Sequence, residues 1–144
     1  MAETIVKIEN LVKRYHELVA VDHFNLTVSK GEILGLLGPN GSGKTTTMNC
    51  LLSLLAYDKG SIEVFGKPMK PDSYDLKRNI GVVFQNVAVF DTLTVQENID
   101  YFCGLYIKDK KLRRQYVAEA VEFAGLSDFA KYYTKELSGG LLRR

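Results

Sequence analysis

The sequence has few cysteines and histidines, and they are not spaced as ligands. Its 144 residues include two cysteines, Cys50 and Cys103, with no C-x-x-C pair and no Cys/His cluster. This spacing argues against a structural disulfide or a zinc site and indicates reduced thiols in a cytosolic protein. The two histidines, His16 and His23, are interpreted as ordinary surface or strand residues rather than as ligands or bases.

Long apolar runs and an excess of one charge are also missing. No window approaches the roughly 20 apolar residues that cross a bilayer, and the first four residues lack the basic start of a signal peptide. If the protein serves a membrane, another chain or segment must do the crossing. The net charge of +2 is too small for the basic face typical of nucleic-acid binding. No nucleic-acid partner is therefore expected, and 46% hydrophobic residues indicate an ordinary globular chain with a core.

The clearest motif is Gly38-Pro39-Asn40-Gly41-Ser42-Gly43-Lys44-Thr45, which fits the P-loop pattern G-x-x-x-x-G-K-[ST]. The apolar run 33–37 before it predicts a buried strand, and residues 45–55 after it predict a helix. In this context the loop N–H groups and the helix N-terminus surround phosphate oxygens. Lys44 would reach the β- and γ-phosphates, and the Thr45 hydroxyl would ligate Mg²⁺. The motif predicts a nucleotide-binding chain.

Strand signals flank this motif on both sides. β-branched or apolar segments at 4–9, 18–21 and 24–28 follow one another without helices, which predicts an antiparallel sheet beside the P-loop core. Further strands are predicted at 61–65 and 80–84, with one or two helical turns over 72–78 between them, where Asp72 is a candidate N-cap. Gln85 follows the buried strand at 80–84, and ligands gather beyond the carboxyl ends of such strands.

The chain becomes helical after residue 91. Thr94 and Glu97 form a capping box that starts a helix, and an apolar face is predicted on it. That face comprises Val95, Ile99, Phe102, Cys103 and Tyr106. A second helix is predicted from Lys110 to Ala124, closed by Gly125. The basic run 108–114 is interpreted as a solvated face, with nucleic-acid or lipid contact as the alternatives.

Four signals stand in order along the chain: Tyr15, the P-loop at 38–45, Gln85, and Leu137-Ser138-Gly139-Gly140. The last precedes a helical-looking segment, so its serine and glycines would lie at a helix N-terminus, a second place for an anion. This set resembles the ATP-binding cassette (ABC) ATPase family, the nucleotide-binding domains of ABC transporters, over the whole chain.

The resemblance implies a role for each signal. Tyr15 would stack on adenine, and Gln85 would contact Mg²⁺ and the attacking water and connect to the membrane subunit. The segment 137–140 would be the signature motif, which caps the γ-phosphate on a partner's P-loop in a head-to-tail homo- or heterodimer. Lys44 and Gln85 are the predicted catalytic residues, and Thr45 and Gln85 the predicted Mg²⁺ ligands. The predicted ATP-binding residues are Tyr15, Gly38, Pro39, Asn40, Gly41, Ser42, Gly43, Lys44, Thr45, Thr46, Ser138, Gly139 and Gly140.

The fold that the resemblance implies is α/β, a P-loop NTPase (RecA-like) core with an N-terminal antiparallel β subdomain and a partial α-helical subdomain. The predicted domains are 1–90, the ATP-binding core, and 91–144, the helical signature subdomain. Two departures from the family stand out: Leu141 replaces the usual glutamine, and the Walker B strand ending in Asp-Glu does not occur. The chain is therefore expected to be truncated before that strand, to bind nucleotide weakly and to hydrolyse it poorly or not at all.

The function implied is that of an ATPase subunit that works with a transmembrane permease, at the cytoplasmic face of the cell membrane. The runs 93–98 and 101–106 resemble cassettes of drug- and antibiotic-export systems, which favours export over import. One alternative is a soluble ABC protein that acts on ribosomes or nucleic acid. Another is an unrelated P-loop small-molecule kinase, which accounts for 38–45 but gives no reason for Ser138-Gly139-Gly140 or Gln85.

Overall fold

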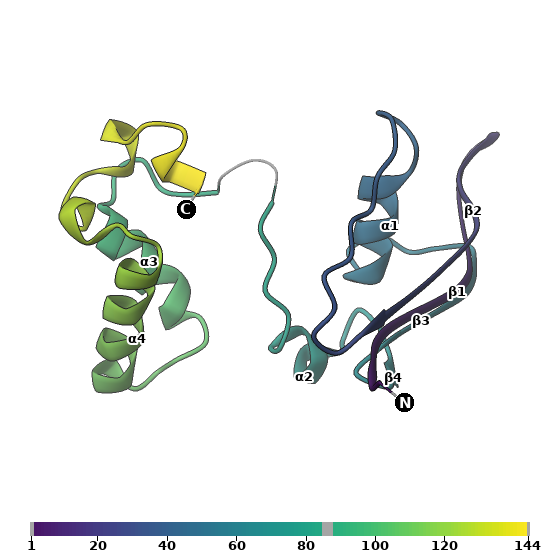
Figure 1. Cartoon of the computed structure of the whole chain (residues 1–144), viewed down its shortest axis with the longest axis horizontal. Helices are drawn as coiled ribbons and strands as arrows, with labels where there is room; N and C mark the ends of the chain where they lie inside the picture. Colours follow the sequence, from purple (N-terminus) through teal and green to yellow (C-terminus); the bar gives the residue numbers. More distant parts are fainter. Residues whose placement is uncertain (1, 85–87, 144) are drawn as a thin grey trace. The chain divides into compact units, whose positions relative to one another are not determined.

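The computed structural model describes residues 2–84 and 88–143. It divides into two compact units, Met1–Ile80 and Gly81–Arg144, and each is described by itself (Figure 1). Gln85, a predicted site residue, lies outside the described residues.

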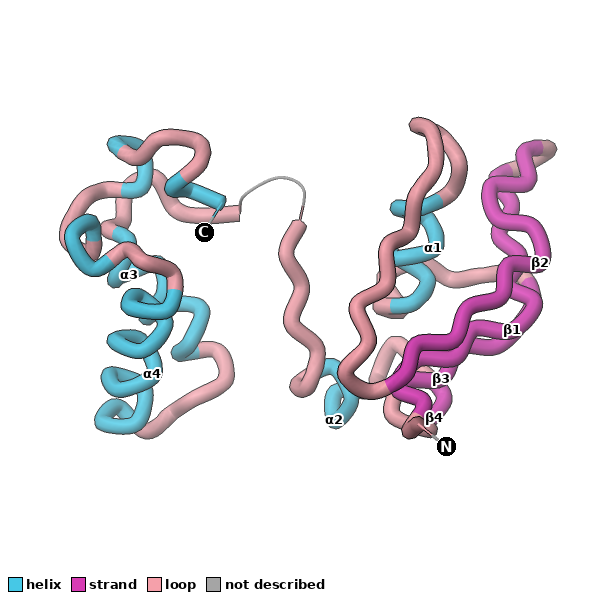
Figure 2. The backbone as a smooth tube through the Cα atoms, in the orientation of Figure 1, coloured by secondary structure: helices cyan, strands magenta, loops and turns pink. Residues whose placement is uncertain are grey.

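A four-stranded antiparallel sheet forms one layer of the first unit, and Figure 2 shows its strands in magenta. The strands lie in the order β2-β1-β3-β4 and comprise β1 Thr4–Tyr15, β2 Leu18–Ser29, β3 Lys59–Val64 and β4 Lys67–Pro68. β1 pairs with both β2 and β3. The antiparallel sheet predicted from the β-branched segments is confirmed, and the segments 18–21 and 24–28 are two parts of one strand.

Apolar side chains from the sheet pack against helix α1 (Lys44–Leu51) and the single turn α2 (Tyr74–Lys77). The buried core residues are Ile8, Leu11, Val21, Cys50, Ile62, Val64, Met69 and Leu76. Burial in this core raises the pKa of the Cys50 thiol, which keeps it protonated at neutral pH. The turn predicted over 72–78 is present, although its N-cap is Ser73 rather than Asp72.

α1 is shorter than the predicted helix over 45–55. Its C-cap is Leu52, and Ser53 takes a positive φ of 53° that no helix continues through. The chain then turns back, and Leu55 packs against the same core as Leu51. The apolar residues at the end of the predicted helix are thus buried by a turn rather than by a helical face.

The strands predicted at 33–37 and 80–84 are wrong for this structure, which has no strand at either place. Ile33 is fully exposed at 100%, Leu37 at 92% and Val83 at 95%. A buried strand needs neighbouring strands to pair its N–H and C=O groups and to cover its side chains. No strand in residues 2–84 or 88–143 pairs with either segment, so the apolar pattern alone does not make them strands.

The second unit consists of helices α3 (Val95–Gly104) and α4 (Lys110–Phe123) followed by three 3₁₀ turns. These turns are Ser127–Phe129, Thr134–Glu136 and Leu141–Arg143. Both predicted helices are confirmed, with the capping box at Thr94 and a positive φ of 63° at Gly125. The Asp109 side chain caps α4 by accepting hydrogen bonds from two backbone N–H groups.

Only part of the apolar face predicted on α3 points into the core. Val95 is buried, and Ile99 and Cys103 pack beside it against α4. Phe102 is instead 40% exposed, and its ring packs on Phe90 with the centroids 6.1 Å apart. Tyr106 also remains exposed. The helix therefore carries a narrow aliphatic stripe toward its core and a separate aromatic cluster at its surface.

A buried amide holds the segment before α3 in place. The Asn98 side chain is 3% exposed; its Oδ1 accepts from the Phe90 N–H at 2.8 Å, and its Nδ2 donates to the Phe90 carbonyl at 3.0 Å. The Thr134 hydroxyl donates to the same carbonyl at 2.9 Å. Residues 90 and 134 are far apart in the sequence, so these bonds fasten the entrance of α3 to the turn that precedes residues 137–140.

Replacing Thr94 with alanine is expected to lower the free energy of unfolding by about 1 kcal/mol, as loss of an N-cap side chain usually does. The Thr94 Oγ1 accepts from the Glu97 N–H at 3.2 Å, and the Thr94 N–H and hydroxyl both donate to the Glu97 carboxylate. Urea denaturation with an unchanged m-value measures the effect. Gln96→Ala, an exposed change two residues further along the chain, serves as the control. Its free energy of unfolding should stay within about 0.5 kcal/mol of wild type.

The same cap predicts a pH dependence. Hydrogen bonds from the Thr94 backbone and then from its hydroxyl lower the pKa of Glu97. The stabilisation of the folded chain by this carboxylate is therefore fully present above the pKa that Glu97 has in the unfolded chain. It is lost as the pH falls through the lower folded-state pKa. The difference in free energy of unfolding between wild type and Thr94→Ala should become smaller in acid. A difference that becomes larger there would contradict the role of Glu97 in this cap.

Candidate functional site

The loop 38–45 is positioned by a close approach of its backbone to strand β2. Gly43 is the N-cap of α1 and has a φ of 84°, in the left-handed region. A Cβ at this position would lie 2.3 Å from the Ala20 carbonyl oxygen and 3.3 Å from the Val21 side chain. Both the dihedral angle and the contact require glycine, so the motif glycine fixes where the helix starts relative to the sheet.

The Lys44 ammonium crosses the loop that precedes it. Its Nζ donates to the carbonyls of Gly38 and Pro39, both at 2.7 Å, and lies 3.5 Å from Ser42 Oγ. The Lys44 side chain is thus folded back over the loop rather than extended into solvent. A phosphate oxygen at the loop would meet the same ammonium group and accept a charge-assisted hydrogen bond from it.

The first turn of α1 provides further donors. In any α-helix the first N–H groups have no partner within the helix, and here they belong to Lys44, Thr45 and Thr46. No acidic residue lies in this turn, so the positive end of the helix dipole is not neutralised locally. The geometry fits an anion at the loop, and a triphosphate fits it better than a single phosphate because the loop, the lysine and the helix end are contiguous.

A magnesium ion would depend on the nucleotide for most of its ligands. Within residues 2–84 and 88–143, no group of three His, Cys, Asp or Glu side chains could hold a metal. The exposed Thr45 offers one hydroxyl oxygen. Mg²⁺ commonly keeps several waters and binds through substrate phosphates, so this single protein oxygen is consistent with a Mg-nucleotide and not with a resident metal.

Tyr15 is the last residue of β1 and lies in the same unit as the loop. Its side chain is 43% exposed, and the Lys13 Nζ lies 5.3 Å from the centroid of its ring. Lys13 is a residue that the sequence analysis missed, although positions i and i+2 of a strand share one face. The pair presents an aromatic face beside a cation, which suits a stacked base next to negative phosphates.

Ser138, Gly139 and Gly140 are exposed and precede a short 3₁₀ turn rather than the predicted α-helix. The Ser138 Oγ accepts from the Leu141 N–H at 3.4 Å, and its carbonyl accepts from the Leu142 N–H at 3.0 Å. Leu141, the departure from the family pattern, packs against the core of the second unit. The residue therefore anchors the serine-glycine segment to the helices. Ser138, Gly139 and Gly140 belong to the second unit, and the P-loop belongs to the first.

Comparison with known proteins gives a consistent result. A family model described as ABC transporter matches residues 21–144. A probable multidrug ABC transporter ATP-binding protein, YbhF of Escherichia coli, is 34% identical over 142 residues, which cover 99% of this chain and 25% of that protein. A probable sulfate/thiosulfate import ATP-binding protein, CysA of Chlorella vulgaris, is 38% identical over 96% of this chain and 58% of that protein. The chain thus spans between a quarter and three fifths of these relatives.

A solved structure shows the same fold. The ATP-binding cassette MJ0796, as a dimer bound to ADP and Pi in a post-hydrolysis state, matches with a TM-score of 0.79 at 28% identity. The match covers 96% of this chain and 65% of that one. It confirms the predicted P-loop NTPase class with an antiparallel β part and a helical part. Across the described residues, no helix has the length and apolar composition that crossing a bilayer requires.

Proposed function

The chain belongs to the ABC transporter family, and we propose that it binds Mg-ATP at residues 38–45 as part of the ATPase subunit of a membrane transporter. The observation that carries the proposal is the loop itself. Gly43 fits against β2, and Lys44 folds over the loop at the N-terminus of α1. A small-molecule kinase would share this loop but not the match over residues 21–144.

Lys44, Thr45 and the start of α1 would hold the nucleotide. The Lys44 ammonium exchanges its carbonyl contacts for oxygens of the β- and γ-phosphates, and the N–H groups of the first helical turn donate to the phosphates. The Thr45 hydroxyl would hold the Mg²⁺ of a Mg-nucleotide, which would neutralise charge on the phosphates. Lys44 is the catalytic residue that the described part of the chain provides, because it stabilises charge on the transferred phosphoryl group.

The remaining family roles are proposals that rest on the resemblance. Gln85 would contact the Mg²⁺ and the attacking water, and Ser138, Gly139 and Gly140 would bind the γ-phosphate held by a second nucleotide-binding domain. Exposure of these three residues supports that role, because a segment that binds another molecule must be accessible. Hydrolysis between the two domains would then drive transport through a permease at the inner face of the membrane.

Export is the proposed direction. The name of YbhF, a probable multidrug transporter protein, supports it together with the runs 93–98 and 101–106, whereas the CysA relative is named for import. Purification of the protein with its partners tests the transporter assignment itself, whichever the direction of transport. A multi-spanning membrane protein among them supports the transporter, and ribosomes in its place would support the soluble alternative.

Replacing Tyr15 with alanine is expected to weaken ATP binding by about tenfold, because stacking of one base on an aromatic ring is worth roughly 1–3 kcal/mol. The affinity for inorganic tripolyphosphate, which has no base, should not change. Competition against a fluorescent ATP analogue measures both affinities. Equal losses of affinity for ATP and for tripolyphosphate would show that Tyr15 stabilises the loop rather than stacking on the base. Binding of tripolyphosphate to the wild-type chain tests separately whether the loop holds phosphates.

A further inference from the structure

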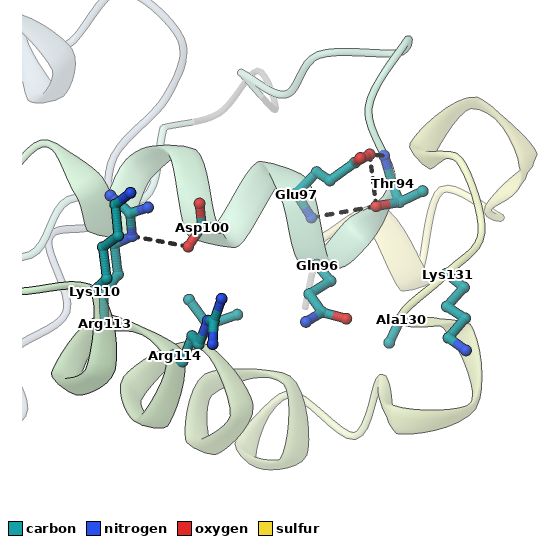
Figure 3. A pocket seen from close by; sticks show the side chains of 10 residues that line it. Thr94, Gln96, Glu97, Asp100, Lys110, Arg113, Arg114, Ala130 and Lys131 are labelled. Carbon is teal, nitrogen blue, oxygen red and sulfur yellow. Dashed lines mark hydrogen bonds and ion pairs between the residues drawn. The ribbon is translucent and has the colours of Figure 1, made fainter.

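A groove lies between α3 and α4 in the second unit, and the proposed nucleotide function does not use it (Figure 3). Its volume is about 700 Å³, within the range of sites for small molecules. Every residue that lines it belongs to the unit Gly81–Arg144. The groove is therefore formed entirely by the second unit.

Four of the ten residues that line the groove are basic, against two that are acidic. Lys110, Arg113, Arg114 and Lys131 line it, and the first three come from the basic run that the sequence singles out. Figure 3 shows Lys110, Arg113 and Arg114 along α4 and Lys131 on the segment beyond it. Four cations around one concavity repel one another unless anions lie among them.

The two carboxylates in the groove are already engaged. Glu97 accepts hydrogen bonds from the Thr94 N–H and hydroxyl, both at 2.8 Å. Asp100 pairs with Arg113, whose Nε lies 2.9 Å from its Oδ1. Among residues 2–84 and 88–143, Lys110, Arg114 and Lys131 have no carboxylate within ion-pair distance. The groove retains a net positive charge that its own acids do not neutralise.

Arg113 adds a buried donor to these charges. Its Nε is close to Asp100, but the pair lacks hydrogen-bond geometry, and the atom is buried without an acceptor in the described part of the chain. The guanidinium lies over Gly104 at the end of α3, where a Cβ would come within 2.8 Å of one of its nitrogens. The Asp100 carboxylate lies against the Arg113 Nε, so the cations left to meet a ligand are Lys110, Arg114 and Lys131.

We propose that the α3–α4 groove binds a small soluble anion with two or more negative charges, of the class of a diphosphate or a phosphorylated metabolite. Its oxygens would lie among Lys110, Arg114 and Lys131, with the apolar wall of Val117 beside them. Guanidinium and ammonium groups together favour a phosphate over a neutral ligand, because their hydrogen bonds are charge-assisted. A concave groove of this volume can take in a small molecule, whereas the flat face of a membrane would reach only its rim.

Titration of the full chain with inorganic pyrophosphate, followed by amide NMR shifts, tests this site residue by residue. We expect saturable shifts at residues of α3 and α4 that line the groove, such as Gln96 and Arg113. The double change Lys110→Gln/Arg114→Gln should weaken that binding by at least about tenfold. The Lys44→Ala variant should keep these shifts, which separates the groove from pyrophosphate at the P-loop.

The matched control is Lys108→Gln/Lys111→Gln, which removes the same charge from exposed positions that do not line the groove. It should bind pyrophosphate at the groove as wild type does. Equal weakening in both double variants, or shifts confined to residues 38–46, would overturn the proposal. So would flotation with phosphatidylglycerol vesicles that depends on Lys110 and Arg114 in a protein that shows no pyrophosphate response, because the groove would then serve a lipid surface.

Discussion

Replacing Lys44 with alanine is expected to weaken Mg-ATP binding by at least about 100-fold, because one group loses charge-assisted bonds to two phosphates worth about 1.5–3 kcal/mol each. The side chain also spans the loop through the Gly38 and Pro39 carbonyls, so its loss frees the loop as well as removing the charge. Isothermal titration of the folded chain with Mg-ATP measures the affinity directly. Wild-type affinity in this variant would remove the basis of the proposed nucleotide site.

The control for this experiment is Lys30→Ala in the same unit. Lys30 is exposed and its Nζ lies 3.1 Å from the Glu3 carboxylate, an ion pair of the surface kind that contributes little to stability. The change removes the same charge from the chain and should leave ATP affinity within about twofold, since screened surface charges act weakly at a distance. Similar losses in both variants would point to bulk electrostatics instead of a specific contact.

Local signals in the sequence predicted helices α3 and α4 and the N-terminal sheet correctly. The capping box at Thr94 and the glycine after Ala124 specify where helices begin and end through short-range hydrogen bonds. The β-branched segments at 4–9 and 24–28 specify strands that pair with one another along the chain. Most hydrogen-bond partners in these elements come from residues close in the sequence. The residues of each element are therefore enough to predict it.

The strands predicted at 33–37 and 80–84 are absent, and local signals could not show this. An apolar run gains the energy of a buried strand only when other strands lie on both sides of it. The run itself does not encode those neighbours, and the described residues do not provide them. Likewise, the apolar end of the helix over 45–55 could not distinguish a longer helix from the turn at Ser53 that buries Leu55.

The candidate site was predictable where its chemistry is contiguous in sequence. The loop 38–45 carries its lysine, glycines and helix start within one motif, and the structure places them together. Contacts between distant residues carry no such signal. The approach of Gly43 to Ala20 and the groove formed by α3 and α4 appear only once the chain is folded. Lys13 beside Tyr15 is the intermediate case, since strand alternation could have indicated it.

Replacing Asn98 with alanine is expected to lower the stability of the second unit by about 3 kcal/mol, because the change removes the hydrogen bonds of a buried amide, worth about 0.5–1.5 kcal/mol each, and takes away the acceptor of the Phe90 N–H. The amide oxygen accepts from the Phe90 N–H, and the two N–H groups of the amide are shared among the carbonyls of Phe90, Leu93 and Thr94, at 3.0, 3.3 and 3.1 Å. The Asn98 side chain itself is 3% exposed, so its own polar atoms have protein partners rather than bulk water. The Thr134 hydroxyl shares only one of these acceptors and cannot replace the amide.

Native-state hydrogen exchange measures this loss where it occurs. The Val95 N–H donates to the Tyr132 carbonyl across the two segments that Asn98 and Thr134 hold together, at 3.0 Å. We expect its protection factor to fall by about 100-fold in Asn98→Ala, as a loss of about 3 kcal/mol requires. The matched control is Gln115→Ala. Within the part of the chain that the structure describes, this exposed amide on α4 bonds only to the Glu119 side chain, so its loss should cost less than about 0.5 kcal/mol.

A second substitution separates the donors of the amide from its acceptor. Asn98→Asp keeps an oxygen for the Phe90 N–H but places a carboxylate against the carbonyls that the amide bonds, so burial and these carbonyls raise its folded-state pKa. The folded form then binds the proton more tightly than the unfolded one. The variant should therefore gain stability as the pH falls through that raised pKa and keep the gain below the unfolded value. A variant that loses stability in acid at the same rate as wild type would show that the donors of Asn98 do not hold the segment before α3.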